Sequence, residues 1–288
     1  MDIVIQIALN AVIAGAIYAL IALGFNLIYG TAKFFDLGYG ALATVGGYSV
    51  YYFYKSLELN IVTSIALGVL LAGTLGFLIE KVVYKQLRVK KASSTVLLVA
   101  SLGVLTVVQA IVAIIFSSQF QTLSRNIGDE RTFNIFGGII TQTQTLIFFA
   151  GIAIMIGLGL ALKYTLFGKA VRAVSDDEEV SKIVGINSER ILGKVFFIGS
   201  AIAGLAGIAV GFDTGIEPTM GMHLLLKGVI AAIIGGIGNI YGGVLGAFFL
   251  ATIENLGAWQ FAGEWKDAIA FIVLIIFLLF RPQGILKK

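Results

Sequence analysis

Residues 163–194 read KYTLFGKAVRAVSDDEEVSKIVGINSERILGK, and this charged segment interrupts a chain that is otherwise strongly apolar. It holds six basic and five acidic residues within 32 positions, whereas the sequence on either side is hydrophobic enough to lie in a bilayer. A membrane protein that keeps one compact polar segment commonly uses it to bind something at one membrane surface. The segment therefore indicates where the chain leaves the membrane, and it predicts a contact there.

The composition predicts a membrane protein. Hydrophobic residues make up 58% of the 288 positions and charged residues 12%, against about 25% charged residues in an ordinary globular chain. A soluble domain of this size could not bury so much apolar surface, so lipid must surround much of the chain. The 36 glycines suit membrane helices that pack closely. The net charge of +4 gives no indication of nucleic-acid binding, and the lack of cysteine excludes disulfides and thiolate metal sites.

Eight apolar stretches are candidates to cross a bilayer, which takes roughly 20 residues of helix. The first is too long for a signal peptide and has no basic residue before it, so we expect no cleavage after it. The seventh is too long for one straight helix, and the sequence GGIGN at Gly235–Asn239 is expected to break it. The stretches are Ile3–Tyr29, Leu37–Tyr54, Ile61–Val83, Ser94–Phe116, Thr145–Leu162, Val195–Phe212, His223–Gly257 and Glu264–Phe280.

The distribution of Lys and Arg predicts the orientation of these stretches, because basic residues concentrate on the cytoplasmic side. The linker 81–91 has five basic residues and segment 163–194 has six, so both should be cytoplasmic, whereas loop 117–144 has two and should be outside. The basic C-terminus should be cytoplasmic and the N-terminus outside. A single seventh crossing would place the C-terminus outside. His223–Gly257 is therefore expected to enter and return as two short helices hinged near Gly238–Asn239.

The fold class that follows is an all-α polytopic membrane protein with about eight transmembrane helices and a broken or re-entrant helix pair near 223–257. Residues 1–288 are expected to form a single transmembrane domain. Its polar projection is the cytoplasmic segment 163–194.

This segment is expected to fold as short helices. Apolar residues recur at helical spacing among its charges between 168 and 187, which predicts one or two short amphipathic helices. Ser175, followed three residues later by Glu178, resembles a capping box that starts the second helix, and Gly185 is expected to end it. Four consecutive acidic residues disfavour an anionic membrane surface, so we prefer docking into a groove on a partner over a solvated loop or a helix on lipid.

Polar residues and the glycine-rich break inside the apolar stretches are candidates for a transport pathway. Non-helical backbone at membrane depth occurs where it is buried in protein or lines a cavity, and half-helix ends often bind a substrate there. Close packing through Gly242 and Gly246 is an equal alternative for the break, and interhelical hydrogen bonds are the commoner role of the polar side chains. The row Ala203, Gly207 and Gly211 is expected to serve packing. The pathway candidates are Asn10, Asn26, Gln109, Gly238, Asn239 and Glu254.

The motifs of membrane-embedded hydrolases and nucleotide-binding proteins are missing. The sequence has no serine in a Gly-x-Ser-x-Gly context, no His-Glu-x-x-His and no pair of aspartates inside an apolar stretch. It lacks the G-x-x-x-x-G-K-[ST] phosphate-binding loop, so the chain cannot itself be an ATPase. His223, the only histidine, has no metal-ligand partner at useful spacing and is expected to be structural. We therefore expect no enzyme and no cofactor or metal bound by this chain.

Three blocks of sequence stand out together: GAIYALIALGFNLIYG (15–30) with DLGYGALATVGGY (36–48), FGKAVRAVSDDEEVSKIVGINSERI (167–191) with GSAIAGLAGIAVG (199–211), and LLKGVIAAIIGGIGNIYGGVLGAFFLATIENL (225–256) with DAIAFIVLIIFLLFRPQGIL (267–286). In this order they resemble the permeases of bacterial branched-chain amino acid ABC importers, the Liv type, and are more similar to the first permease of the pair than to the second. The family commonly has Asn-Phe-Ala-His-Gly where this chain has Asp36-Leu37-Gly38-Tyr39-Gly40. Asp36 and Tyr39 are therefore further pathway candidates, and the difference leaves related solutes open.

The resemblance implies one transmembrane permease domain of an importer whose energy comes from other chains. Its partners would be a second permease subunit, two ATP-binding cassette subunits that bind ATP and Mg, and an extracytoplasmic solute-binding protein, with membrane lipid around the helices and no nucleic acid. In such families the region 168–187 couples the permease to a groove on the ATPase. The coupling residues implied are Gly168, Ala170, Arg172, Asp176, Asp177, Glu178, Gly185 and Asn187.

The predicted function is therefore inward transport of leucine, isoleucine or valine across a bacterial or archaeal plasma (inner) membrane. The solute's carboxylate is expected to meet the half-helix N-terminus near Ile240, because the helix dipole there favours anions. Other ABC permeases carry urea, amides or other amino acids, and these solutes remain alternatives. A stand-alone secondary transporter or channel and a membrane scaffold without a pathway are the alternatives from other classes.

Overall fold

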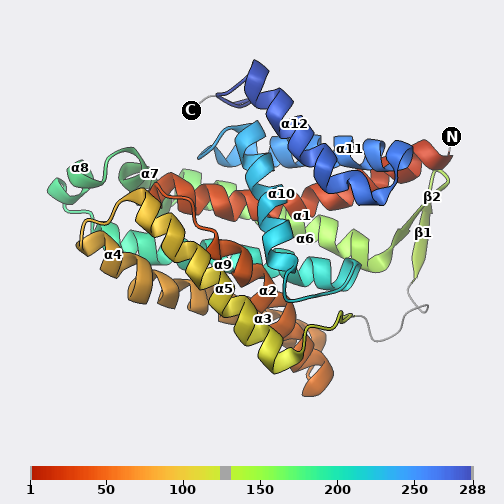
Figure 1. Cartoon of the computed structure of the whole chain (residues 1–288), viewed down its shortest axis with the longest axis horizontal. Helices are drawn as coiled ribbons and strands as arrows, with labels where there is room; N and C mark the ends of the chain where they lie inside the picture. Colours follow the sequence, from red (N-terminus) through yellow and green to blue (C-terminus); the bar gives the residue numbers. More distant parts are fainter. Residues whose placement is uncertain (1, 124–130, 287–288) are drawn as a thin grey trace.

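The computed structural model describes residues 2–123 and 131–286, and this part of the chain is mostly helical (Figure 1). The long elements are helices, and the strands form one short hairpin. In chain order the elements are α1 (Asp2–Ala32), α2 (Gly38–Val50), the π-helix η1 (Tyr51–Ser56), α3 (Ile61–Ile79), the π-helix η2 (Glu80–Tyr84), α4 (Lys85–Val89), α5 (Ser94–Phe116), β1 (Thr132–Ile135), β2 (Gly138–Thr141), α6 (Gln142–Tyr164), α7 (Leu166–Asp176), α8 (Glu178–Ile183), α9 (Ser188–Asp213), α10 (Met220–Gly235), α11 (Ile240–Phe261), the 3₁₀-helix η3 (Gly263–Trp265) and α12 (Lys266–Phe280).

Six helical stretches in the described residues are long and apolar enough to cross a membrane. Two further stretches expected to cross form shorter helices. Residues 37–54 fold as α2 and continue into η1, and residues 264–280 fold as η3 and the 15-residue α12. The chain is thus a polytopic helical protein, as expected. The six long stretches are Ile3–Ala32, Ile61–Val89, Ser94–Phe116, Gln142–Tyr164, Ser188–Asp213 and Ile240–Phe261.

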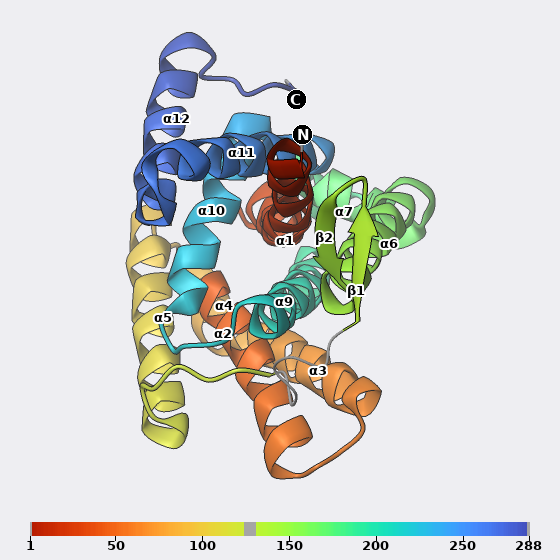
Figure 2. The same cartoon turned by 90° about the vertical axis from the view of Figure 1, so that its right-hand side faces the viewer.

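Helix α1 forms the centre of the molecule. Figure 2 shows it end-on, with α11, α10, α9 and α6 around it. In its most apolar window 83% of the residues are buried, against 17% for α5 and 22% for α6. A helix that is apolar on every side belongs in a core, whereas an apolar helix that remains exposed needs another apolar surface. Helices α5 and α6 therefore present faces that suit lipid or a second membrane subunit.

Glycines allow α2 and α9 to cross at short range. A Cβ atom added to Gly46 would lie 2.4 Å from the Cα of Gly204, and one added to Gly207 would lie 1.9 Å from the carbonyl oxygen of Ala43. Such approaches exclude any side chain, and they bring the two backbones into direct van der Waals contact. The packing role predicted for Gly207 is confirmed.

The two ends of the molecule carry different elements. The N-terminal end of α1 and the β1–β2 hairpin lie at one end, and α4, α7 and α8 lie at the other (Figure 1). The hairpin pairs Thr132 with Thr141 in antiparallel register. Gln6 of α1 anchors it, because the Gln6 side chain both accepts from the Ile139 N–H (2.8 Å) and donates to the Ile139 carbonyl (3.0 Å). This hairpin lies in the loop expected at 117–144 and was not predicted.

The seventh apolar stretch is broken where predicted. Helix α10 ends at Gly235 and α11 begins at Ile240. Gly236 and Gly238 have φ angles of 113° and 80°, which are strained for any residue with a side chain. Helix α11 then runs alongside α1, whereas α10 runs across it (Figures 1 and 2). We call the connection 236–239 the bend.

The charged segment folds as the two short helices expected, α7 and α8. The predicted capping box was wrong in detail. Asp177 is the N-cap of α8 and accepts from the backbone N–H groups of Glu179 (2.8 Å) and Val180 (3.0 Å). Ser175 lies instead in the last turn of α7 and donates to the carbonyl of Gly30 (2.7 Å). Gly185, at a φ of 86°, follows the end of α8 as predicted.

Candidate functional site

The bend is held by one side chain of α1. The Oδ1 atom of Asn26 accepts from the N–H of Gly238 (2.9 Å), and its Nδ2 donates to the carbonyl of Asn239 (3.1 Å). Asn26 is 1% exposed, so both bonds form away from solvent. Backbone groups freed by a helix break need partners inside a membrane protein. Asn26 supplies them, which makes it an interhelical clamp as well as a pathway candidate.

The N-terminus of α11 is capped from within the chain. The Asn239 side chain accepts from the N–H of Gly242 (3.1 Å), as an N-cap residue does. The glycines that follow also pack closely, since a Cβ on Gly242 would lie 2.3 Å from the carbonyl oxygen of Gly235. The bend and the tight packing weighed against it in the sequence therefore occur together. In this conformation a solute carboxylate would have to compete with Asn239 for the helix end near Ile240.

The segment that follows α12 closes the opposite side of the bend. The N–H groups of Ile285 and Leu286 donate to the carbonyls of Ile234 (2.8 Å) and Gly235 (3.0 Å), the last two residues of α10. Gly284 has a φ of 82°, and a Cβ on it would lie 2.4 Å from the Cα of Gly236. Sequence reasoning missed this contact. The only signal was a glycine shortly after a proline, which marks a turn without naming its partner.

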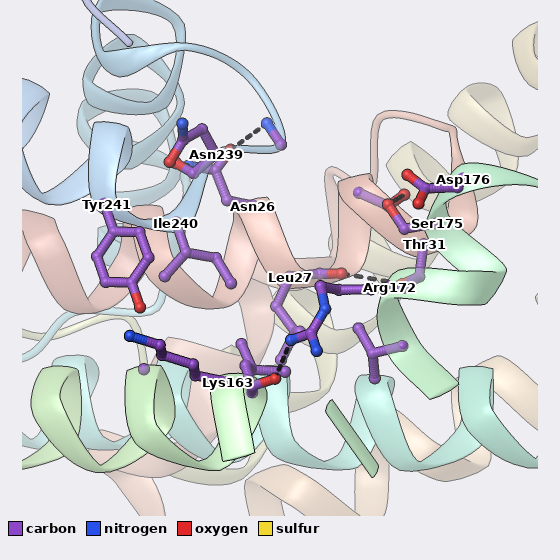
Figure 3. A pocket seen from close by; sticks show the side chains of 15 residues that line it. Asn26, Leu27, Thr31, Lys163, Arg172, Ser175, Asp176, Asn239, Ile240 and Tyr241 are labelled. Carbon is purple, nitrogen blue, oxygen red and sulfur yellow. Dashed lines mark hydrogen bonds between the residues drawn. The ribbon is translucent and has the colours of Figure 1, made fainter. Parts of the chain in front are cut away.

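A cavity of about 540 Å³ lies between the bend, α1, α6 and α7 (Figure 3). Two separate groups of predicted residues line it. Asn26, Gly238 and Asn239 come from the pathway candidates, and Arg172 and Asp176 come from the charged segment. Leu27, Leu162, Val171, Ile240 and Tyr241 supply apolar walls. We define this cavity, together with the bend and α7, as the candidate functional site.

Helix α7 is braced against the ends of α6 and α1. A Cβ on Gly168 would lie 2.0 Å from the Leu162 carbonyl oxygen, so only glycine allows α7 to fold back on α6. Arg172 donates through Nη1 to the same carbonyl. Ser175 bonds to Gly30, four residues after the clamp residue Asn26 in α1. These contacts connect α7 to the last turns of α1, where Asn26 in turn contacts the bend.

The exposed tip of the charged segment is apolar. Three apolar side chains are exposed there: Val180 (53%) and Ile183 (83%) in α8, and Val184 (68%), the residue that follows it. Beside them Lys182 pairs with Glu178 at 2.7 Å, and this hydrogen bond raises the pKa of Lys182. A cluster of exposed apolar side chains on a polar segment suits burial against another protein.

The other predicted coupling residues have local roles. Asp177 caps α8, and Asn187 caps α9 by accepting from the Arg190 N–H (3.0 Å). Ala170 is half-buried in α7. Caps fix where each short helix begins, so these residues set the shape of the segment.

Glu254 lies in an ion-pair network away from the cavity. Its Oε1 accepts from Lys227 of α10 (2.5 Å) and its Oε2 from the Tyr18 hydroxyl of α1 (2.9 Å). Lys227 also pairs with Asp267 of α12 (2.8 Å), whose other oxygen lies 3.8 Å from His223. Glu254 is fully buried, and Tyr18 lies at the midpoint of α1. The network joins four helices, and buried charges of this kind need partners.

Asp36 and Tyr39 also lie away from the cavity, in structural contacts. The Tyr84 hydroxyl donates to Asp36 (2.6 Å), and burial raises the pKa of Asp36 to about 6 although that bond favours the charged form. The Tyr39 hydroxyl donates to the Ile21 carbonyl (3.2 Å) in the space that Gly24 leaves free. Tyr84 was not singled out in the sequence.

The remaining pathway candidates are more peripheral. Asn10 is exposed and accepts a hydrogen bond from Gln6 (3.1 Å), at the hairpin end of α1. Gln109 is half-buried on α5. Neither residue lines the cavity.

Comparisons with known proteins match nearly the whole chain. The family model described as "Branched-chain amino acid transport system / permease component" matches residues 7–278. The high-affinity branched-chain amino acid transport system permease protein BraD of Pseudomonas aeruginosa is 31% identical to this chain. The alignment covers 99% of this chain and 96% of BraD. LivH of Escherichia coli is 29% identical with the same coverage, and the probable LivH of Methanocaldococcus jannaschii is 28% identical over 96% of this chain and 90% of its own length.

A solved structure shares the fold. The chain aligns with PsaBC from Streptococcus pneumoniae, solved in complex with Fab, at a TM-score of 0.53 and 14% identity, covering 95% of this chain and 91% of that one. This likeness concerns the arrangement of helices alone. The family model over residues 7–278 and the 31% identity to BraD lead to one conclusion: the chain belongs to the permease-component family of branched-chain amino acid transport systems.

Proposed function

We propose that this chain is the transmembrane permease subunit of an ATP-driven importer of leucine, isoleucine and valine. Membership of the permease family and the names of the relatives support the solute class. The observation that carries the mechanism is the cavity where the bend and α7 meet. A chain without a nucleotide-binding loop needs one site that contacts an ATP-binding subunit and one site on the transport pathway. In this proposal α7 belongs to the first and the bend to the second, and both line the same cavity.

We infer that the chain crosses the inner membrane about eight times, with the α10–α11 pair entering and returning. The N-terminus is placed outside and the C-terminus in the cytoplasm. The positive-inside rule supports this orientation, because the two basic segments lie at the same end of the molecule. Linker 81–91 contains α4, and segment 163–194 contains α7 and α8.

The proposed partners are a second permease subunit, two ATP-binding subunits and an extracytoplasmic binding protein. ATP and Mg are bound by the partner subunits and not by this chain. Helices α7 and α8 dock on an ATP-binding subunit, with Val180 and Ile183 buried in the contact and the charges around them setting its orientation. Closure of the ATP-binding subunits moves α7, and the Ser175–Gly30 contact passes the movement to α1.

The bend is the proposed gate at the inner end of the pathway. A shift of α1 relative to α11 breaks or remakes the bonds of Asn26 to Gly238 and Asn239. The α11 N-terminus then exchanges its cap from Asn239 for the carboxylate of the passing solute. Asp36, Tyr39 and Glu254 act in this scheme as supports of the surrounding helices.

Uptake by the assembled importer in proteoliposomes tests this function. The complex with its binding protein should take up labelled leucine, isoleucine and valine only with ATP inside, and excess unlabelled urea should not compete. Gly238→Leu should reduce uptake at least tenfold, because a side chain cannot adopt the φ of 80° without strain. Thr252→Ala, at an exposed site on α11, is the control.

Two results would contradict the proposal. Uptake driven by an ion gradient with this chain alone would make it a secondary transporter. Unchanged uptake by both Gly238→Leu and Asn239→Ala, in complexes that contain all subunits, would remove the bend from the pathway.

A further inference from the structure

A second cavity, of about 510 Å³, continues from the first along the surface between α6 and α11. The two cavities share Gly159, Lys163, Ile240 and Tyr241. Along α6 the lining runs from Met155 to Tyr164, which corresponds to about 14 Å at 1.5 Å per residue. One leaflet contributes about half of the roughly 30 Å hydrocarbon core of a bilayer. This groove, which we call the α6–α11 groove, is thus about as deep as one leaflet.

The α6–α11 groove is apolar and open at its side. Its rim includes Ile156, Leu160 and Leu245, which are 57%, 52% and 49% exposed. The space between the helices is open at Gly159. A Cβ atom added there would lie 3.6 Å from the Tyr241 ring, an ordinary contact distance. A groove of this kind, on a helix that is itself mostly exposed, takes up apolar chains in preference to water.

Two cations lie where the groove ends. Lys163, in the last turn of α6, lines both cavities, and Arg172 of α7 lines the adjoining one together with the carboxylate of Asp176 (Figure 3). Arg172 uses Nη1 for the Leu162 carbonyl, and the rest of its planar guanidinium keeps further donors. Lysine and arginine side chains commonly bind phosphate groups, because their charged N–H donors form strong hydrogen bonds with phosphate oxygens. Basic pockets between helices on the cytoplasmic side bind anionic lipid headgroups.

We propose that the α6–α11 groove binds an anionic phospholipid, with an acyl chain along α6 and the headgroup phosphate at Lys163. The inference rests on the cytoplasmic placement of α7 and α8 in the proposed function. Three features fit together in it: the groove is as deep as a leaflet, it is apolar along that depth, and Lys163 lies at the end next to α7, which the proposed orientation puts at the membrane surface. A zwitterionic solute would use the cations but not the length of the groove.

Native mass spectrometry of the assembled importer in non-ionic detergent tests lipid binding without any transport step. Titration with palmitoyl-oleoyl phosphatidylglycerol should show tighter binding than with the phosphatidylcholine of the same chains. Lys163→Gln should weaken phosphatidylglycerol binding about fivefold, the effect of one cation, and leave phosphatidylcholine binding unchanged. Lys169→Gln is the matched control, because Lys169 is exposed on α7 but lines neither cavity.

A second pair of variants tests the groove itself. Gly159→Leu places a side chain in the groove and should reduce binding of both lipids, whereas Gly159→Ala fits at ordinary contact distance and should bind both. Glycerophosphate, a headgroup without chains, should not displace the lipid at millimolar concentration.

Several results would overturn the proposal. Equal affinity for the two lipids, or equal behaviour of Lys163→Gln and Lys169→Gln, would remove the charge recognition. Displacement of phosphatidylglycerol by leucine would make the cavity a solute vestibule. A cross-link from Leu160→Cys to the second permease subunit would fill the groove with protein. If the unmodified importer bound phosphatidylglycerol as expected but did not take up leucine, isoleucine or valine, the result would contradict the proposed function and not the lipid site.

Discussion

Asn26 shows how one side chain replaces the backbone hydrogen bonds that a broken helix gives up. Without it the N–H of Gly238 has no partner, whereas the Asn239 carbonyl still accepts from Gly243. The residue is fully within α1, so the stability of the bend depends on a helix that is far away in sequence. This explains why a polar residue lies in the buried part of the central helix α1.

Replacing Asn26 with alanine should destabilise the bend by about 1–3 kcal/mol, the cost of one buried unpaired donor. The purified protein should unfold at lower temperature in detergent, and leucine uptake by the assembled importer should fall. Asn255→Ala is the matched control, because Asn255 bonds only to the Ala251 carbonyl in its own helix. Equal thermal stability of the two variants would show that Asn26 does not hold the bend.

The effects of substitutions at Lys227 and Glu254 on thermal stability should not be additive, because the two side chains form an ion pair. Lys227→Met leaves the buried carboxylate of Glu254 without its cation, which costs about 3–5 kcal/mol in such sites. The double variant Lys227→Met with Glu254→Gln removes both charges and should recover most of the lost thermal stability. A double variant as unstable as the single one would mean that packing, and not charge, holds these helices together.

At the scale of the elements, the sequence predicted what is local. Glycine density located the break between α10 and α11, and apolar residues at helical spacing within the charged segment located α7 and α8. The N-cap of α8 was misplaced because Ser175, Asp176 and Asp177 are all good capping residues, and only tertiary contacts decide among them. Ser175 turns away because the Gly30 carbonyl of α1 is within reach. The hairpin was missed because its strands are four residues each and depend on Gln6 for anchorage.

The tip of α8 should bind an ATP-binding subunit through its apolar side chains. Ile183→Glu places a charge in that contact and should reduce co-purification of the ATP-binding subunits at least tenfold, with the chain still folded. Phe136→Glu is the control, since Phe136 is equally exposed (88%) at the opposite end. Normal co-purification of Ile183→Glu would place the docking surface elsewhere.

For the whole molecule, hydropathy and charge predict the fold class because the bilayer leaves few alternatives. They could not predict which distant segments meet. Three contacts join remote parts of the chain. Helix α7 contacts α1, the residues after α12 cap α10, and Lys227 pairs with Glu254 and Asp267. The candidate site is built from such contacts. Five of its lining residues, Asn26, Gly238, Asn239, Arg172 and Asp176, were therefore predicted singly, but their assembly around one cavity was not.

The orientation of the whole molecule can be tested directly, because the sequence contains no cysteine. Phe136→Cys at the hairpin should react with an impermeant maleimide added to intact spheroplasts, and Val89→Cys in the basic linker 81–91 should react only after the membrane is opened. Both side chains are exposed, so accessibility differs only by side. Labelling in the reverse order would invert the proposed topology.

The backbone bonds between the residues after α12 and the end of α10 have a consequence for the order of synthesis. The carbonyls of Ile234 and Gly235 are made well before Ile285 and Leu286. While α11 and α12 emerge from the ribosome, the bend lacks these partners. The bend can therefore reach its final form only after α12 has been inserted. A chain released before that point would have α10 but would lack the two hydrogen bonds that close the bend.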